Sequence, residues 1–399
     1  MADDDPFAGR ARRAGGGKAS PRARASSPAR PGNGNRQAGS NTTRSPDRAA
    51  RNLPDGQART RQSFAALDLG TNNCRLLIAR PAGEDFTVID AFSRVVRLGE
   101  GLAHSGRLSN DAMDRTVAAL GVCAEKLRRR HVFLARSVAT EACRQARNGE
   151  AFIERVREET GIALDIISAR EEARLAVLGC HILLEAGAGP AMIFDIGGGS
   201  TELVLVDTRQ TIPRILDWQS VPWGVVSLTE SSAVEGVNEA DRIARYDDMR
   251  ARVLDSFGDF IERTAPLRDG AAKSGPLRLL GTSGTVTTLA SLHLQLPHYD
   301  RSVVDGSIVP AHSMREICTM LSTLDLEGRR QVPCIGRERA DLVVAGCAIL
   351  EAILDIWPAG RLGIADRGIR EGILRSMMAA QGQGARKRAA LLRKRGDCG

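Results

Sequence analysis

The sequence places an aspartate at the same point of two similar stretches, after an apolar run and before a glycine turn. Asp68 lies in FAALDLGTNNCRLLIAR and Asp195 in AMIFDIGGGSTELVLV. A carboxylate beside phosphate bound at such a turn would be repelled unless a cation lay between them. Mg²⁺ takes one or two carboxylates together with water and phosphate oxygens, so Asp68 and Asp195 are the predicted metal ligands. For either aspartate alone, an Asx hydrogen bond that closes its own turn is the alternative.

Three glycine turns have the composition of a phosphate cradle. Glycine adopts positive φ and lets backbone N–H groups come close to an anionic oxygen. The third turn, GTSGT, is expected to run from a strand into a helix, whose N-terminus adds further N–H donors. The residues singled out on these turns are Gly70, Thr71, Asn72, Gly197, Gly198, Gly199, Ser200, Gly281, Thr282, Ser283 and Gly284. A hairpin that uses glycine for turn geometry alone is the alternative, and three such turns in one chain weaken it.

Two adjacent glutamates in ISAREEARL have different predicted roles. Ser168 and Glu171 have the S-x-x-E spacing of a helix capping box, so Glu171 already has a structural role. Glu172 has none, and helical geometry turns it about 100° from its neighbour. A carboxylate there could take a proton from water that attacks phosphate. On this segment alone, a solvated glutamate on the helix surface is the favoured alternative.

Two arginines could present a bidentate fork to phosphoryl oxygens, Arg97 in VRLGEGL and Arg144 in ATEACRQARN. A lone surface arginine is the commoner outcome for such residues. The six histidines form no pair at catalytic or metal-binding spacing, and neither a G-x-S-x-G motif nor a Walker loop occurs. Acyl transfer and P-loop chemistry are therefore not expected.

The elements that must hold these residues form two similar halves. Short strand-like runs alternate with amphipathic segments from Phe64 onward. Ser109 is predicted to cap the first long helix, and helices are predicted over residues 110–130, 149–160, 170–184, 237–264, 285–294 and 339–357. Both halves open on a hairpin with Asp-x-Gly at its tip, 127 residues apart. This predicts a duplicated α/β unit with a cleft in which both turns face one ligand.

The charge of the chain is concentrated at its ends. The chain has 399 residues and a net charge of +8. Residues 1–62 contain 13 Lys/Arg and five Asp/Glu, and the last sixteen residues contain six basic residues and one acidic residue. The leader has almost no aliphatic periodicity and is predicted to be disordered. Basic ends could contact polyanions such as nucleic acid, but a solvated leader is the favoured interpretation. Without a membrane span, a secretory signal or a cysteine pair among its eight cysteines, the chain is expected to be cytoplasmic, with reduced thiols.

Seven segments together resemble the exopolyphosphatase / guanosine pentaphosphate phosphatase family over residues 63–380. They are ALDLGTNNCRLLIA, VRLGEGL, ATEACRQARN, ISAREEARL, FDIGGGSTEL, GTSGTVTTLA and ADRGIREGIL, in the order typical of the family. The resemblance implies an α/β fold of two tandem ribonuclease-H-like domains of the actin-like ATPase superfamily. It implies domains over 63–189 and 190–380 around an interdomain cleft, with the last helix free to pack back on the first domain and a basic tail over 381–399.

The resemblance also implies Mg²⁺-dependent hydrolysis of a terminal phosphoanhydride. The substrate would be inorganic polyphosphate, the 5′ γ-phosphate of guanosine pentaphosphate, or both. The family's water-activating glutamate falls on Glu172, and its metal and phosphate positions fall on Asp68, Asn72, Arg144, Asp195, Gly197 to Ser200, Glu202 and Gly281 to Gly284.

Some features depart from the family or stay open. Ser283 stands where many relatives have glycine, which would narrow the third turn, and the chain ends soon after REGIL, like the short forms of the family. An actin-like sugar or acid kinase and a non-catalytic nucleotide-binding module are the alternatives of other classes. The choice between the two substrates and a homodimer both stay open.

Overall fold

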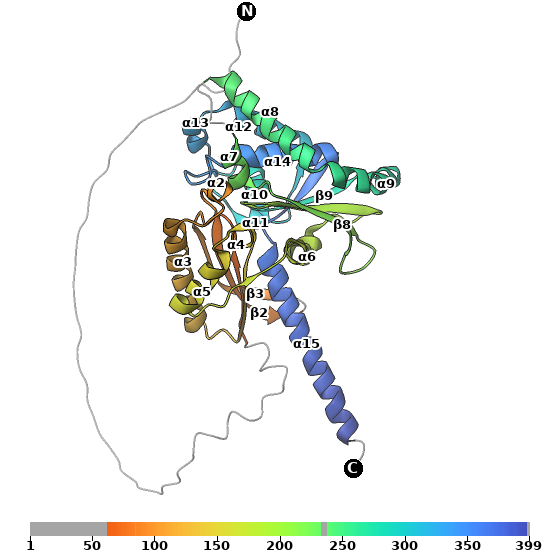
Figure 1. The fold of residues 1–399 in the computed structure, drawn as a ribbon. Coiled ribbons are helices and arrows are strands. Elements are labelled where there is room, and N and C mark those ends of the chain that lie inside the picture. The colour runs from red at the N-terminus through yellow and green to blue at the C-terminus, as the bar shows by residue number, and fades with distance from the viewer. Residues whose placement is uncertain (1–61, 84, 233–237, 397–399) are drawn as a thin grey trace, which may run out of the picture. The chain divides into compact units, whose positions relative to one another are not determined.

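A computed structural model describes residues 62–83, 85–232 and 238–396, with side chains as far as residue 382. Two β-sheets organise this part of the chain (Figure 1). The five-stranded sheet has the order β3-β2-β1-β4-β5, and the six-stranded sheet has the order β10-β11-β9-β6-β7-β8. The leader predicted to be disordered, residues 1–62, lies outside the described residues except for Gln62.

The first half of the fold contains the five-stranded sheet. Its strands are β1 (Phe64–Leu69), β2 (Asn73–Ala82), β3 (Asp85–Val95), β4 (Leu134–Ala139) and β5 (Asp165–Ile166). Its helices are α2 (Leu102–Ser105), α3 (Asn110–Arg129), α4 (Glu141–Gln145), α5 (Gly149–Thr160), α6 (Ala169–Cys180) and the 3-10 turn η1 (His181–Leu183).

The second half contains the six-stranded sheet. Its strands are β6 (Pro190–Ile196), β7 (Thr201–Asp207), β8 (Arg214–Val221), β9 (Arg278–Thr282), β10 (Ile308–Pro310) and β11 (Arg361–Ala365). Its helices are α7 (Val225–Ser231), α8 (Glu239–Ser256), α9 (Gly258–Ser274), α10 (Gly284–His293), α11 (Arg301–Val304), α12 (Ala311–Thr323), α13 (Leu326–Gln331), α14 (Val343–Ile356) and α15 (Ile369–Gly396).

The central strands are apolar because both of their faces are covered. On β1, Leu67 points into a core shared with α3 and α5, whereas Ala66 points into a core shared with α15. On β6, Phe194 points towards α8, α10 and α14, whereas Ile193 packs against α6. Successive residues of a strand face opposite sides of the sheet, so a strand covered on both sides reads as one apolar run.

The two halves repeat one topology. β1 pairs with β2 antiparallel and with β4 parallel, and β6 pairs with β7 antiparallel and with β9 parallel. In the hairpins, Asp68 lies opposite Arg75 and Asp195 lies opposite Glu202. The strand order therefore repeats around the two aspartates, as the duplication predicted from the sequence requires.

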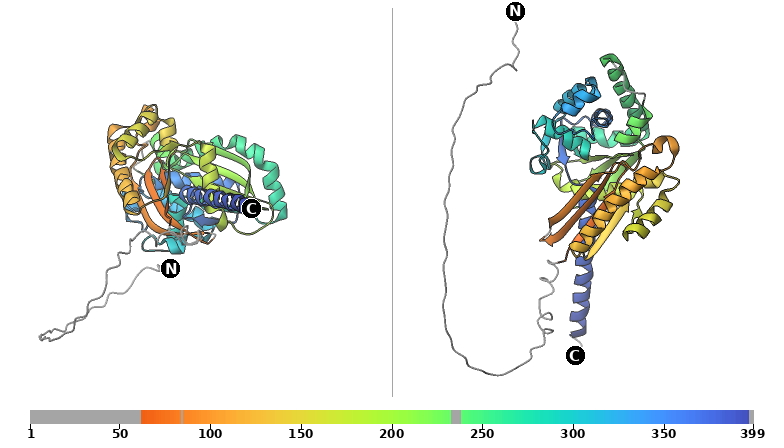
Figure 2. Two further views of the ribbon diagram at one scale, coloured as in Figure 1. Left: turned by 90° about the horizontal axis from the view of Figure 1, so that it is seen from below. Right: turned by 90° about the vertical axis from the view of Figure 1, so that its left-hand side faces the viewer.

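Helices α6 and α15 cross at two glycines. A Cβ on Gly179 would lie 1.9 Å from the carbonyl oxygen of Gly368, and a Cβ on Gly372 would lie 2.0 Å from that of Leu175. Real carbon atoms do not approach this closely, so the crossing requires glycine at both positions. α15 also packs on β1 and β2. The last helix thus packs back on the first sheet, and it then continues beyond the sheet as far as Gly396 (Figures 1 and 2).

Several predicted elements have different bounds in the structure. The helix predicted over 237–264 is two helices, α8 and α9, because the chain turns at Phe257, whose N–H bonds the carbonyls of Asp255 and Leu254. The helix predicted over 339–357 begins only at Val343, since residues 336–342 form turns. The predicted basic tail, residues 381–399, is helical as far as Gly396.

No helix in the described part of the chain combines the length and the apolar character needed to cross a bilayer.

Candidate active site

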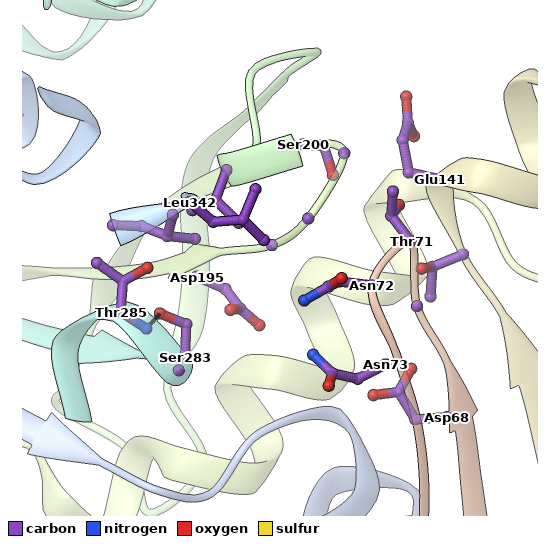
Figure 3. Close-up of a pocket in the computed structure, with 18 of the residues that line it drawn as sticks. Asp68, Thr71, Asn72, Asn73, Glu141, Asp195, Ser200, Ser283, Thr285 and Leu342 are labelled. Atoms are coloured by element: carbon purple, nitrogen blue, oxygen red, sulfur yellow. Dashed lines mark hydrogen bonds between the residues drawn. The ribbon is translucent and has the colours of Figure 1, made fainter. Parts of the chain in front are cut away.

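The three glycine turns and the predicted carboxylates line one pocket between the two hairpins (Figure 3). Of the residues singled out from the sequence, those that line it are Asp68, Gly70, Thr71, Asn72, Glu172, Asp195, Gly197, Gly198, Gly199, Ser200, Glu202, Ser283 and Gly284. Asn73, Thr140, Glu141 and Thr285 line it as well, with an apolar wall of Ile196, Val225, Leu342, Val343 and Ile369.

The glycines of the second turn allow the first turn to approach closely. A Cβ on Gly198 would lie 2.9 Å from Cβ of Thr71, and one on Gly199 would lie 2.6 Å from the Thr71 hydroxyl. None of Gly197, Gly198 and Gly199 has a positive φ. The expectation that these glycines supply left-handed backbone is therefore wrong. Gly198 and Gly199 are needed because the two turns, one from each half, meet at van der Waals distance, whereas a Cβ on Gly197 would lie 2.9 Å from the carbonyl oxygen of Ser200 in its own turn.

The third turn carries a strained serine at the start of a helix. Ser283 has φ 131° and ψ 172°, a backbone region that is essentially reserved for glycine. Its hydroxyl accepts a hydrogen bond from the Thr285 N–H at 3.2 Å and so caps α10. The helix N-terminus faces the pocket, as the sequence predicts, with one of its N–H groups bonded to the serine.

Besides Glu141, four carboxyl groups line the pocket, and burial raises the pKa of each of these four. Burial and then the neighbouring Glu202 raise the pKa of Asp195 to about 8. The same two causes hold the pKa of Glu172 well above its usual value. Burial raises the pKa of Asp68 against the attraction of Arg75, and it raises that of Glu202 although the Ser200 and Ser220 hydroxyls donate to that carboxylate. The pocket therefore has a strong excess of acid, which favours a bound cation.

Two buried oxygens support a cation at the first hairpin. Asp68 Oδ1 and Asn72 Oδ1 are buried without a hydrogen-bond partner, and such oxygens are costly unless a ligand satisfies them. Across the described residues, no three His, Cys, Asp or Glu side chains form a ready-made metal cage. A hard cation here would have to take water or substrate oxygens as its remaining ligands, which is how Mg²⁺ is usually held.

Glu172 lies on the first turn of α6, where Ser168 caps the helix through the Glu171 N–H at 3.2 Å. The residue Glu172 is only 7% exposed, and its Oε2 accepts two hydrogen bonds of 3.2 Å from Arg144. Glu171 instead points away to Arg136 and Arg174. The adjacent glutamates thus face different surroundings, as predicted, although the carboxylate of Glu171 pairs with arginines and does not complete a capping box.

Four residues predicted to bind phosphate lie outside the pocket lining. Arg97 binds Asp341 and the Glu338 carbonyl, and Arg144 binds Glu141, Glu172 and the Ile167 carbonyl, so their forks are already occupied. Gly281 lies within β9 against the Phe194 ring, and the Thr282 hydroxyl donates to the Arg367 carbonyl. The sequence analysis included the two arginines because a guanidinium can present a bidentate fork to phosphate, and it included Gly281 and Thr282 because they belong to the third glycine turn.

Two arginines that the sequence analysis missed line the pocket from opposite halves. The guanidinium groups of Arg339 and Arg75 lie 3.6 Å and 3.9 Å from the point where a Cβ on Gly284 would stand. Arg75 could have been found from the duplication, because Arg75 occupies the same position in the first hairpin that Glu202 occupies in the second. Arg339 precedes α14 in a turn and has no counterpart of this kind.

Two matched α/β halves whose glycine turns and carboxylates face a shared pocket define a phosphate-handling protein with the two-domain, actin-like ATPase type of fold. Residues 77–381 match the model of the Ppx/GppA phosphatase family. The chain belongs to this family of phosphohydrolases.

Relatives with known names or structures agree with this assignment. Exopolyphosphatase 2 of Mycobacterium tuberculosis is 31% identical over 308 residues, which cover 72% of this chain and 89% of that protein. The crystal structure of the Aquifex aeolicus member of the Ppx/GppA family is 26% identical with a TM-score of 0.63, and the match covers 80% of this chain and 98% of that one. An exopolyphosphatase from Cytophaga hutchinsonii has the same fold at 23% identity and a TM-score of 0.70, with coverage of 80% and 98%.

Proposed function

We propose that this protein releases the terminal phosphate of inorganic polyphosphate or the 5′ γ-phosphate of guanosine pentaphosphate, with water as the nucleophile. The observation that carries the proposal is the position of Glu172. It is buried, it is held by Arg144, and it lines the same pocket as Asp68 and Asp195. The names of the relatives, exopolyphosphatases among them, support the same reaction class.

Asp68, Asp195 and the Asn72 amide oxygen would hold Mg²⁺. When bound, the ion would neutralise phosphate oxygens and favour the ionised forms of the carboxyl groups around it. The protein itself supplies Arg75 and Arg339, two cations from opposite halves that suit a polyanionic substrate. The backbone of the three turns and the N-terminus of α10 provide further N–H donors for phosphoryl oxygens.

Glu172 is proposed to take the proton of the attacking water. A general base must be ionised, and burial together with neighbouring acids favours its protonated form. Arg144 acts in the opposite direction because its guanidinium donates two hydrogen bonds to Oε2. Arg144 therefore helps to keep the Glu172 carboxyl group in the ionised form that a general base needs.

Phosphate release from long-chain polyphosphate and from guanosine pentaphosphate, each with Mg²⁺ at equal concentration, tests the proposal directly. Release from either substrate supports it, and the ratio of kcat/KM values identifies the preferred one. A kinase would transfer phosphate to an added alcohol or acid faster than to water, and a binding module would release none. Either result would refute the proposed hydrolysis.

The role of Glu172 has a matched control in its neighbour. Glu172→Gln should lower kcat by about 10²- to 10⁴-fold, the usual value of general-base catalysis, with substrate affinity near that of the wild type. Glu171→Gln should leave kcat within about twofold, because its carboxylate contacts Arg136 and Arg174, which do not line the pocket. Loss of turnover in the Glu171 variant with an active Glu172 variant would reverse the assignment.

A further inference from the structure

Arg97 makes contacts that join the two halves next to the pocket. Its Nη1 donates to Asp341 Oδ2 at 3.1 Å and its Nη2 donates to the Glu338 carbonyl at 3.2 Å. Both partners belong to the turns at residues 336–342, and Arg339, which lines the pocket, lies between them. A guanidinium that bonds a carboxylate and a carbonyl in this way fixes the orientation of the segment that carries them.

The backbone of the same residue is bonded to the first phosphate turn. The N–H groups of Val96 and Arg97 both donate to the Asn72 carbonyl, at 2.9 and 3.1 Å, and the Gly99 N–H donates to the Thr71 carbonyl at 2.9 Å. Arg97 has φ 48°, in the left-handed region that a side chain rarely adopts. Such backbone strain persists only where the surroundings hold it in place, and it is commonest at functional sites.

Arg339 depends on its own turn for its position. Its carbonyl accepts the N–H groups of Leu342 and Val343, both at 3.0 Å, so the residue anchors the start of α14. Its guanidinium, by contrast, makes one long contact of 3.4 Å, with the Thr288 hydroxyl, among the residues that the structure describes. The rest of the turn must therefore hold the backbone of Arg339, and the contacts of Arg97 on either side of it do so from the other half.

We infer that Arg97 is a positioning residue, which holds the Arg339 turn of the second half against the first phosphate turn so that Arg339 can bind an anionic substrate in the pocket. The inference rests on the proposed function for its kinetic consequences. It replaces the direct phosphate contact predicted from the sequence with an indirect one through Arg339. As an isolated ion pair, Arg97 and Asp341 would contribute little to stability, because the side chains of both residues are 35% exposed.

A double-mutant cycle between Arg97 and Arg339 tests the inference. Arg339→Ala is expected to raise KM about 10-fold or more through loss of a charge-assisted hydrogen bond. Arg97→Ala should raise KM about 3- to 10-fold with kcat nearly unchanged, and it should add almost nothing in the Arg339→Ala background because both changes remove one function. Arg97→Lys, which keeps the cation but loses the fork, should lie between the wild type and the alanine variant.

Hydrogen exchange of the peptide that spans residues 336–343 gives a readout that does not need activity. It should be faster in Arg97→Ala than in the wild type, whereas Arg155→Ala should leave it unchanged. Arg155 is a matched control because its side chain, 36% exposed, forms ion pairs with Asp114 and Glu159 on other parts of the first half.

Two results would overturn the inference. If the KM effects of Arg97→Ala and Arg339→Ala multiply in the double variant, Arg97 acts independently, as a direct phosphate contact would. If exchange at 336–343 is the same in Arg97→Ala and the wild type, the arginine does not hold the turn. Should the wild type hydrolyse neither substrate, the proposed function fails, and hydrogen exchange alone then decides whether Arg97 holds the turn.

Discussion

Asp195→Asn is expected to stabilise the metal-free protein at alkaline pH while it weakens the response to Mg²⁺. Burial and the nearby Glu202 raise the pKa of Asp195 from 3.8 to about 8. Because the folded pKa lies above the unfolded value, the associated stability is fully present below about pH 4 and is lost as the pH rises through about 8. An asparagine has no charge to bury, so the variant avoids this loss.

The size of the effect follows from the same shift. One pKa unit corresponds to about 1.4 kcal/mol, so a rise from 3.8 to about 8 makes ionisation in the folded state cost roughly 5–6 kcal/mol. This figure is an upper bound, because part of the carboxyl faces the solvent of the pocket, which screens it. We expect the free energy of unfolding of Asp195→Asn, relative to the wild type, to rise by about 1–3 kcal/mol between pH 5 and pH 9.

Urea denaturation at several pH values, with EDTA present, measures this difference. Asp247→Asn, an exposed aspartate on α8, serves as the control and should show no such trend. Added Mg²⁺ should raise the unfolding midpoint of the wild type at pH 8 and raise that of Asp195→Asn much less, because a ligand that binds only the folded state stabilises it. A pH-independent difference between Asp195→Asn and the wild type would refute the view that Asp195 is a buried acid held for a cation.

Three further changes test the geometry of the turns, the helix crossing and the leader. Ser283→Gly should stabilise the protein by about 1–2 kcal/mol in chemical denaturation, because relief of about 1–3 kcal/mol of backbone strain exceeds the few tenths lost with the cap. Ser109→Gly, a cap with φ −75°, should only lose those few tenths. Gly179→Ala should lower the free energy of unfolding by about 3 kcal/mol or more, because the added Cβ overpacks the helix crossing. Gly121→Ala on α3, where a Cβ meets nothing within 4 Å, should raise it by about 0.5–1 kcal/mol. Equal effects of the two substitutions would refute the close crossing. Deletion of residues 1–61 should raise KM for long polyphosphate at low ionic strength only, with kcat unchanged, because tethered charges are screened within about 8 Å at physiological salt. If the full-length and the truncated protein have identical KM values at both low and high salt, this role is excluded.

The sequence predicted the fold well where local patterns determine it. Repeated hairpins with Asp-x-Gly at their tips indicated two similar α/β halves, and the strand order confirms them. The helix that Ser109 caps begins at Asn110 as predicted. The break between α8 and α9 was not predicted, because the apolar spacing continues through Phe257, whose ring is fully buried in the core of the second half. That break is a consequence of tertiary packing, which a helical period does not encode.

Among the site residues, those on the turns were predictable and the arginines were not. Gly198, Gly199 and Ser283 line the pocket that the sequence predicted for them, and the signal was the occurrence of three glycine turns in one chain, which hairpin geometry alone explains poorly. An arginine has a long side chain whose direction depends on neighbours far away in the sequence. Arg97 reaches Asp341, 244 residues away, and only the fold reveals that it binds this carboxylate. Its charge and position in the sequence suited a phosphate contact equally well.

Each half of the fold contributes one helix that packs on the sheet of the other half, and this packing affects which parts of the site can shift against each other. α6 follows the first sheet in sequence but packs on β6, β7 and β8, and α15 follows the second sheet but packs on β1 and β2. Ala173 and Val177 of α6 pack against the second sheet, which carries Asp195, and Leu175 of the same helix packs in the core of the first sheet, so apolar contacts on both sides hold Glu172. Arg75 and Arg339 come from different halves, and hydrogen bonds such as those of Arg97 connect their surroundings. A change in the width of the cleft would thus alter the spacing of the arginines, and so the binding of the anion, because a few polar contacts deform far more than packed interfaces.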